Sequence, residues 1–225
     1  MCIRDSAKGD YIAILDDDDL VMSDWVEQFQ KAAQEKPGRL LHAYCVQQAW
    51  ERLENGYLRA VGSCLPIYCK DFDWSKQFIV NSCPTLCLAF PRYIFQRLNL
   101  RFDESLDVME DWDYIMRVAT CCGVQDIPVV TSIYRMWKTG NSLELHGQNM
   151  WDDCYQRITE KWNKGPLLMQ AGSEAQILTK KVDECQGISR LYLPGENGYT
   201  EENSIVDVYK RQESSRCSVI FGKTI

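Results

Sequence analysis

The spacing of apolar residues changes between strand-like and helix-like several times along the chain, which predicts an α/β domain. Residues 11–15 form a short apolar run that ends at four aspartates, which is typical of a fully buried strand in a parallel sheet. Residues 24–36 are predicted to form an amphipathic helix, with Ser23 as its N-cap and Pro37-Gly38 at its end. Its apolar face holds Trp25, Phe29, Ala32 and Ala33.

A second amphipathic pattern lies in the middle of the chain. Residues 111–122 are predicted to form a helix that Gly123 closes, and Pro91 is placed as the first residue of a shorter helix. The apolar face of the longer helix holds Trp112, Ile115, Met116 and Ala119. Further strands are predicted at residues 40–46 and 128–134, and a last helix at residues 150–163.

Composition narrows the class of protein. The 225 residues are 45% hydrophobic and 25% charged, which is ordinary for a soluble domain. A net charge of -7 argues against a nucleic-acid partner and against a polybasic membrane anchor, and no apolar run is long enough for a transmembrane segment. The 11 cysteines include no CxxC pair, so reduced thiols in a cytosolic core are favoured over a zinc site. The expected location is the cytoplasm, including the cytoplasmic face of the membrane.

Both ends of the chain are predicted to be foreign. The DNA word GATGTGTATAAGAGACAG encodes Asp207–Gln212 and, read from its second base, Met1–Asp5. This word resembles the transposon end of sequencing adaptors, so we expect a metagenomic translation flanked by adaptor sequence, to be excluded from fold reasoning. The expected organisation is an adaptor-derived segment at 1–6, the main α/β domain at 7–164, an extension at 165–205, and an adaptor-derived or foreign tail at 206–225.

The first candidate site is the run Asp16–Asp19. It follows a predicted buried strand, and ligands of open α/β sheets bind at the carboxyl ends of strands. Asp16 and Asp18 are two residues apart, so in an extended chain they point to the same side and suit a hard divalent cation. A solvated acidic turn before the next helix is the competing interpretation. The pattern excludes an EF-hand.

The second candidate site is Glu110-Asp111, at the start of a predicted helix. A carboxylate at this place is usually a cap, but a helix N-terminus also keeps it ionised, so that it can accept the proton of a sugar hydroxyl. Trp112 beside it suits either the core or a platform for a sugar ring, and its place on the apolar face favours the core.

Four blocks in this order and spacing resemble the inverting family-2 glycosyltransferases. The blocks are Lys8–Asp19 for "G-x-Y-I-x-x-L-D-x-D-D", Arg101–Leu106 for "G-F-D-E-x-L", Glu110–Asp113 for "E-D-W-D", and Tyr134-Arg135 with Asn141-Ser142 for the "Y-R" loop. Arg101 stands where the family usually has glycine, and the family's opening nucleotide-binding strand has no counterpart in the chain. The resemblance implies a GT-A fold, a three-layer sandwich with a mostly parallel sheet whose first strands are missing.

The resemblance also implies the chemistry of the site. Asp111 would be the catalytic base with Glu110 orienting it, and Asp18 with Asp16 would hold Mn²⁺ or Mg²⁺. Asp16, Asp17, Trp112 and Arg135 would contact substrate. The donor would be a nucleotide-sugar, a UDP-sugar by family analogy, and the acceptor a saccharide or lipid-linked saccharide. His146 is read as a surface residue, although some GT-A enzymes use a histidine as a metal ligand.

Two alternatives remain open from the sequence. The chain could be a non-catalytic nucleotide-sugar-binding module, or a cation-binding module that uses only the aspartates, because a fold does not determine a function. With its opening strands absent, the 225-residue chain by itself is expected to transfer no sugar.

Overall fold

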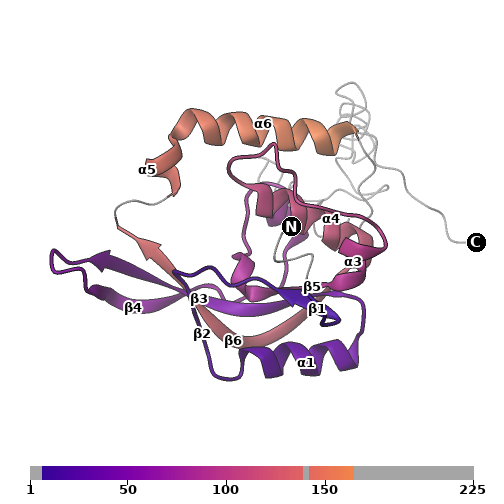
Figure 1. Ribbon diagram of the computed structural model, residues 1–225, viewed down its shortest axis with the longest axis horizontal. Helices are drawn as coiled ribbons and strands as arrows, with labels where there is room; N and C mark the ends of the chain where they lie inside the picture. Colours follow the sequence, from indigo (N-terminus) through magenta and orange to yellow (C-terminus); the bar gives the residue numbers. More distant parts are fainter. Residues whose placement is uncertain (1–6, 139–141, 165–225) are drawn as a thin grey trace, which may run out of the picture. The chain divides into compact units, whose positions relative to one another are not determined.

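The computed structural model describes residues 7–138 and 142–164. In the first of the two compact units into which the chain divides, residues 1–155, one sheet lies between two layers of helices. Helix α1 (Trp25–Glu35) covers one face, and α3 (Arg92–Gln96) and α4 (Glu110–Cys122) cover the other (Figure 1). The predicted three-layer α/β architecture is therefore confirmed. No helix in the described part of the chain is long and apolar enough to cross a membrane.

The sheet has six strands and mixed directions. Its order is β1-β5-β3-β6-β2, with β4 paired to β3. The bounds are β1 Tyr11–Ala13, β2 Leu20–Val21, β3 Leu40–Arg52, β4 Leu58–Tyr68, β5 Leu88–Pro91 and β6 Val124–Trp137. Only β3 and β6 pair in parallel among the described strands, because β5 and β4 return antiparallel against β3 and β2 against β6. The expectation of a mostly parallel sheet is thus wrong for this part of the fold.

Strand β1 is shorter and more exposed than its apolar sequence predicts. Ile12 is buried, but Tyr11 is half-buried and Ala13 is exposed, and Leu15 beyond the strand is 45% exposed. The physical reason is position: β1 is at an end of the sheet order and pairs only with β5, in antiparallel register. A strand in that place is not enclosed on all sides, so the fully buried parallel strand expected at residues 11–15 is wrong.

Helix α1 confirms its predicted apolar face. Phe29 and Ala32 are buried in a core cluster with strand residues, and Trp25 and Ala33 pack against the same cluster. The N-cap is Asp24 rather than Ser23, and its carboxylate accepts a hydrogen bond from Gln28 Nε2 at 2.9 Å. A shift of one residue at a helix end is within the usual scatter of such boundaries.

Helix α4 forms the opposite layer and carries the second candidate site. Its predicted face is confirmed, since Trp112, Ile115, Met116 and Ala119 are all buried. Gly123 ends the helix with φ 69°, a left-handed conformation that favours glycine, and a Cβ there would collide with the Arg39 guanidinium. The position at which α4 ends is therefore determined by Gly123.

The other elements differ mainly in length from the prediction. Strands β3 and β4 form a long hairpin around the Asn55-Gly56 turn, which the aperiodic sequence of residues 48–80 did not predict. Pro91 ends β5 and caps α3 instead of lying inside a helix, and α3 itself has only 5 residues. The remaining elements are α2 Trp74–Gln77, a 3₁₀ turn η2 at Thr85–Cys87, α5 Ser142–His146 and α6 Gln148–Lys164.

Candidate functional site

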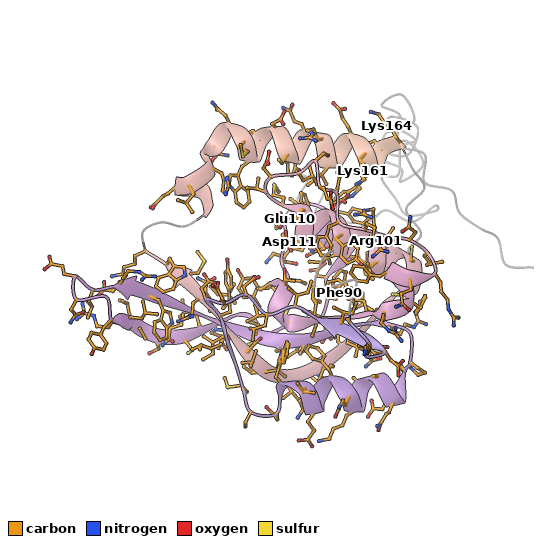
Figure 2. The ribbon with its side chains drawn as sticks, in the orientation of Figure 1. Phe90, Arg101, Glu110, Asp111, Lys161 and Lys164 are labelled. Carbon is orange, nitrogen blue, oxygen red and sulfur yellow. The ribbon has the colours of Figure 1, made fainter. Side chains whose placement is uncertain are left out.

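An acidic cavity of about 790 Å³ brings the two candidate motifs together. Its wall includes Asp16 from the turn after β1 and Glu110 and Asp111 from the first turn of α4. Figure 2 labels Glu110 and Asp111 side by side at that end of α4. The rest of the wall consists of Ile14, Thr85, Phe102, Asp103, Glu104, Leu106, Asp107, Val108, Met109, His146 and Trp151. These described lining residues include six carboxylates and no lysine or arginine, so the cavity suits a cation or a ligand that brings one.

Asp111 is held by three hydrogen bonds. Asn81 Nδ2 donates to Oδ2 at 2.8 Å, Thr85 Oγ1 donates to the same oxygen at 3.4 Å, and the backbone N–H of Trp112 donates to Oδ1 at 2.7 Å. Its side chain is half-buried at the edge of the cavity. The carboxylate is therefore fixed in orientation while it still borders space that a substrate could occupy.

Burial, followed by the neighbouring Glu110 carboxylate, raises the pKa of the Asp111 carboxyl to about 6. The hydrogen bonds from Trp112, Asn81 and Thr85 act in the opposite direction, because they favour the ionised form. A carboxylate with such a pKa is mostly ionised at neutral pH, yet it is more basic than an ordinary aspartate. This is the balance that a general base requires.

The backbone just before Asp111 is strained. Met109, the N-cap of α4, has φ 63° and ψ 14°, a left-handed conformation that costs energy for a residue with a side chain. Strain of this kind persists where the surrounding structure fixes it, and it gathers at functional sites. Met109 itself lines the cavity.

The run of four aspartates is divided between the cavity and the sheet. Asp19 is buried, and its Oδ1 accepts the backbone N–H of Arg135 at 2.8 Å; burial raises the pKa of Asp19 to about 6. Asp18 Oδ2 accepts Trp137 Nε1 at 2.7 Å. Asp18 and Asp19 thus tie the turn after β1 to strand β6, and neither lines the cavity.

Asp16 alone of this run faces the cavity, and burial followed by the charges of Asp18 and Asp17 raises its pKa. Asp17 is exposed and does not line the cavity. Within residues 7–138 and 142–164, no three His, Cys, Asp or Glu side chains are grouped so that they could hold a metal ion. The described chain could therefore supply only one or two ligands, which is how Mg²⁺ is often bound when substrate phosphates and water complete its shell.

Arg135 does not reach the cavity. It is 9% exposed, its Nε donates to the backbone carbonyl of Asp18, and its guanidinium lies 5.0 Å from the Trp50 ring centroid and 5.4 Å from that of Trp137. The two indoles lie opposite each other on β3 and β6 and hold it by cation–π contact. The structure gives Arg135 a role in packing between β3 and β6, and its contact with the donor stays a prediction. Asn141 of the same predicted block lies outside the described residues.

Trp112 is part of the core rather than a sugar platform. It has 0% exposure, its Nε1 donates to the Gln77 carbonyl at 2.6 Å, and its ring stacks on Tyr155 at 5.5 Å. This burial agrees with the place of Trp112 on the apolar face of α4, and its contact with substrate stays a prediction. The tryptophan that lines the cavity is Trp151, and the described atoms offer no partner to its buried indole N–H.

Sequence reasoning missed the side chains that orient Asp111. Asn81 and Thr85 lie in a segment without periodic pattern, 30 and 26 residues before the carboxylate that they contact. No local signal connects residues so far apart. A further cavity of about 780 Å³ lies beside α1 and contains none of the predicted site residues.

Comparison with known proteins gives the family and the fold of the chain. The family model described as Glycosyl transferase family 2 matches residues 3–123, which is more than half of the chain. The chain belongs to glycosyl transferase family 2. The match includes both the Asp16–Asp19 turn and the start of α4. No curated protein matches the chain.

Solved structures similar to this family-2 chain show the same fold. One is S. aureus TarS 1-349 in complex with UDP-GlcNAc, with TM-score 0.53, 10% identity, and coverage of 80% of this chain and 50% of that chain. Another is S. aureus TarS 1-349, with TM-score 0.50, 13% identity, and coverage of 80% and 49%. The chain thus spans about half the length of these structures. At such identity the likeness establishes the GT-A fold.

Proposed function

We propose that this family-2 chain carries the catalytic base and metal-binding motifs of an inverting glycosyltransferase that uses a nucleotide-sugar donor. The observation that carries the proposal is the Asp111 carboxylate, oriented by Asn81 and Thr85 and placed with Asp16 on one acidic cavity. A half-buried carboxylate with its pKa raised to about 6 is suited to take a proton from a sugar hydroxyl at neutral pH.

The reaction proposed is a single displacement. Asp111 removes the proton of an acceptor hydroxyl while that oxygen attacks the anomeric carbon from the face opposite the nucleotide. The new glycosidic bond forms as the bond between the anomeric carbon and the diphosphate oxygen breaks. The electron pair of the broken bond stays on that phosphate oxygen, which leaves with the nucleotide. Glu110, on the same cavity wall, orients the acceptor.

Asp16 is proposed to hold Mn²⁺ or Mg²⁺, with a smaller share from Asp18 because Trp137 already occupies one of its oxygens. When bound, the ion supplies a positive charge for the leaving diphosphate. The excess of carboxylates on the described cavity wall supports this assignment, since no lysine or arginine there could neutralise a diphosphate. Trp151, which lines the cavity together with Phe102, is proposed to contact a sugar ring.

The donor is proposed to be a UDP-sugar, and the acceptor a saccharide or lipid-linked saccharide. The TarS complex with UDP-GlcNAc makes that compound the first donor to test. The test uses a full-length protein that contains this chain, with Mn²⁺ and a panel of UDP-sugars, beside its Asp111→Asn variant. Removal of a general base typically lowers kcat by about 10²- to 10⁴-fold. We expect a loss in that range, with the affinity for the donor retained.

Three results would contradict parts of this proposal. Turnover that survives in Asp111→Asn would remove Asp111 from the role of base. Nucleotide binding without turnover on any donor would favour the non-catalytic binding module, and metal binding that is indifferent to nucleotide would favour a cation-binding module.

A further inference from the structure

Two side-chain amides, the buried Gln77 and the half-buried Asn81, connect α2 to the Asp111 carboxylate. Gln77, the last residue of α2, has 0% exposure and donates from Nε2 to Asn81 Oδ1 at 3.1 Å. Asn81 in turn donates from Nδ2 to Asp111 Oδ2 at 2.8 Å. The three side chains therefore form one directed series of hydrogen bonds that ends at the candidate base.

The direction of this series is fixed at its buried end. Gln77 Oε1 accepts two bonds from Ser82, from the backbone N–H at 2.8 Å and from Oγ at 2.6 Å, so its NH₂ group must face Asn81. Asn81 Oδ1 accepts from Gln77 and also from the backbone N–H of Cys83 at 3.3 Å. With its oxygen engaged there, the NH₂ group of Asn81 is the end that faces Asp111.

The segment that carries Asn81 is also held from the side of the sheet. His42 on β3 contacts Asp126 on β6, with Nδ1 and Oδ1 2.7 Å apart, and its Nε2 lies 3.6 Å from Cys83 Sγ. His42 and Cys83 are each 2% exposed. Asn81 is therefore constrained on two sides, by the contact of nearby Cys83 with His42 and by its own hydrogen bond to Asp111.

Resting on the proposed function, we propose that Asn81 is a positioning residue for the Asp111 base and that Gln77 fixes the Asn81 amide in the orientation that does so. Among residues 7–138 and 142–164, Asn81 and Thr85 donate to Oδ2, whereas Oδ1 receives only the Trp112 N–H. A carboxylate has about four acceptor positions, so a position remains on Oδ1. Oδ1 is thus the oxygen that takes the proton from the acceptor hydroxyl.

The effect of Asn81 on the proton affinity of Asp111 has a definite sign. A donated hydrogen bond stabilises the ionised carboxylate, so loss of this donor raises the pKa of Asp111 above its value of about 6. The other titratable groups that face Asp111 stay in place in the variants below. They are Glu110 on α4, Tyr134 on β6, and Asp16, Asp103, Glu104, Asp107 and His146 around the cavity.

The test follows the ¹³C signal of the Asp111 carboxyl by NMR during a pH titration of the 225-residue chain, with Asp111→Asn to assign the signal. In Asn81→Leu we expect the midpoint to rise by about one pH unit, the usual size of the effect of one strong hydrogen bond. In Gln77→Met we expect a smaller rise, because the Asn81 amide is freed but not removed. The matched control is Asn55→Leu in the exposed hairpin turn, which should leave the midpoint unchanged.

An unchanged midpoint in a folded Asn81→Leu chain would overturn the proposal. If that variant fails to fold, Asn81→Asp keeps the side-chain volume and places a carboxylate where the donor was. The Asp111 carboxyl and the introduced carboxyl then titrate as a pair, and the higher of their two midpoints must lie above the midpoint of Asp111 in the parent chain. A midpoint equal to that of the parent chain would overturn the proposal. A residue that served only the fold would reduce the folded fraction and leave the midpoint where it was.

The titration does not require turnover, so it separates this proposal from the proposed function. In an active full-length enzyme, Asn81→Leu should lower kcat at neutral pH with an unchanged KM for the donor, and shift the acid limb of the pH profile upward. A shifted midpoint in an inactive protein would support the positioning role and contradict the enzyme. A loss confined to KM would overturn the positioning role.

Discussion

The molecule has two acidic motifs, the turn Asp16–Asp19 and the helix start Glu110–Asp113. Both contain carboxylates with two different roles, but different interactions assign those roles. In each motif some carboxylates line the cavity and others stabilise the fold. Asp16 faces the cavity while Asp19 bonds to the backbone of β6, and Asp111 faces the cavity while Asp113 is buried against Arg117. The identity of a residue within an acidic cluster therefore does not reveal its role.

The difference lies in what sets the direction of each side chain. In α4, successive residues are separated by about 100°, so Asp113 points roughly opposite to Asp111 and enters the core with Trp112 and Tyr114. In the turn, the direction is set by individual bonds from Trp137 and Arg135. The helix start is fixed by packing, whereas the aspartate turn is fixed by hydrogen bonds to β6.

The largest effect is expected at Asp113, where the helix motif depends on a buried ion pair. Asp113 has 0% exposure and lies 2.7 Å from Arg117 Nη2. Removal of one partner of such a pair leaves a charge uncompensated and typically costs about 3 to 5 kcal/mol. Asp113→Ala should therefore lower the free energy of unfolding, measured with urea, by about 3 kcal/mol. The control Asp111→Asn should cost far less, and equal losses would refute the division of roles.

A smaller effect is expected in the Asp16–Asp19 turn, where the measured quantity is the affinity for Mn²⁺. Asp16→Asn should weaken Mn²⁺ binding in the presence of UDP by at least about 10-fold, because even residues that only support a ligand often contribute that much. Asp18→Asn should have a weaker effect, because Trp137 uses one of its oxygens. Calorimetry of the variants measures this, with the exposed Asp17→Asn as the matched control. A larger loss in Asp18→Asn than in Asp16→Asn would reverse the assignment.

The same contrast explains what the sequence could predict. Helices α1 and α4 were predicted within one residue at most ends, because their apolar faces repeat with the helical period and packing follows that repeat. Motif order identified Asp16, Glu110 and Asp111 as candidates, but only the structure places the three on one cavity wall. Sheet direction did not, since the pairing of β1 with β5 joins residues far apart in the chain.

The roles of single side chains were the least predictable. No sequence pattern near Arg135 indicates that its guanidinium will make a cation–π contact with Trp50. That contact arises from the parallel register of β3 and β6. Asn81 is likewise assigned only by its contact with Asp111 in space. Candidate carboxylates can therefore be chosen from sequence motifs, whereas the neighbours that orient them are found only in the structure.

The smallest effect is expected at Met109, the residue with a strained backbone just before Glu110. The helix motif has such a residue beside it, and the aspartate turn contains none. Among the described residues other than glycine, only Asn99 and Met109 have positive φ, and no residue of the aspartate turn does. Met109→Gly removes the strain but adds freedom to the unfolded chain, so the net gain in the free energy of unfolding should be under about 1 kcal/mol. Met109→Val, with a branched side chain, should instead lower the free energy of unfolding by about 1 kcal/mol or more.

If the strain serves to aim Asp111, the Met109→Gly variant of a full-length enzyme will be more stable than the parent and will have a lower kcat. A stabilised variant with unchanged kcat would show that the conformation of Met109 is only a consequence of packing.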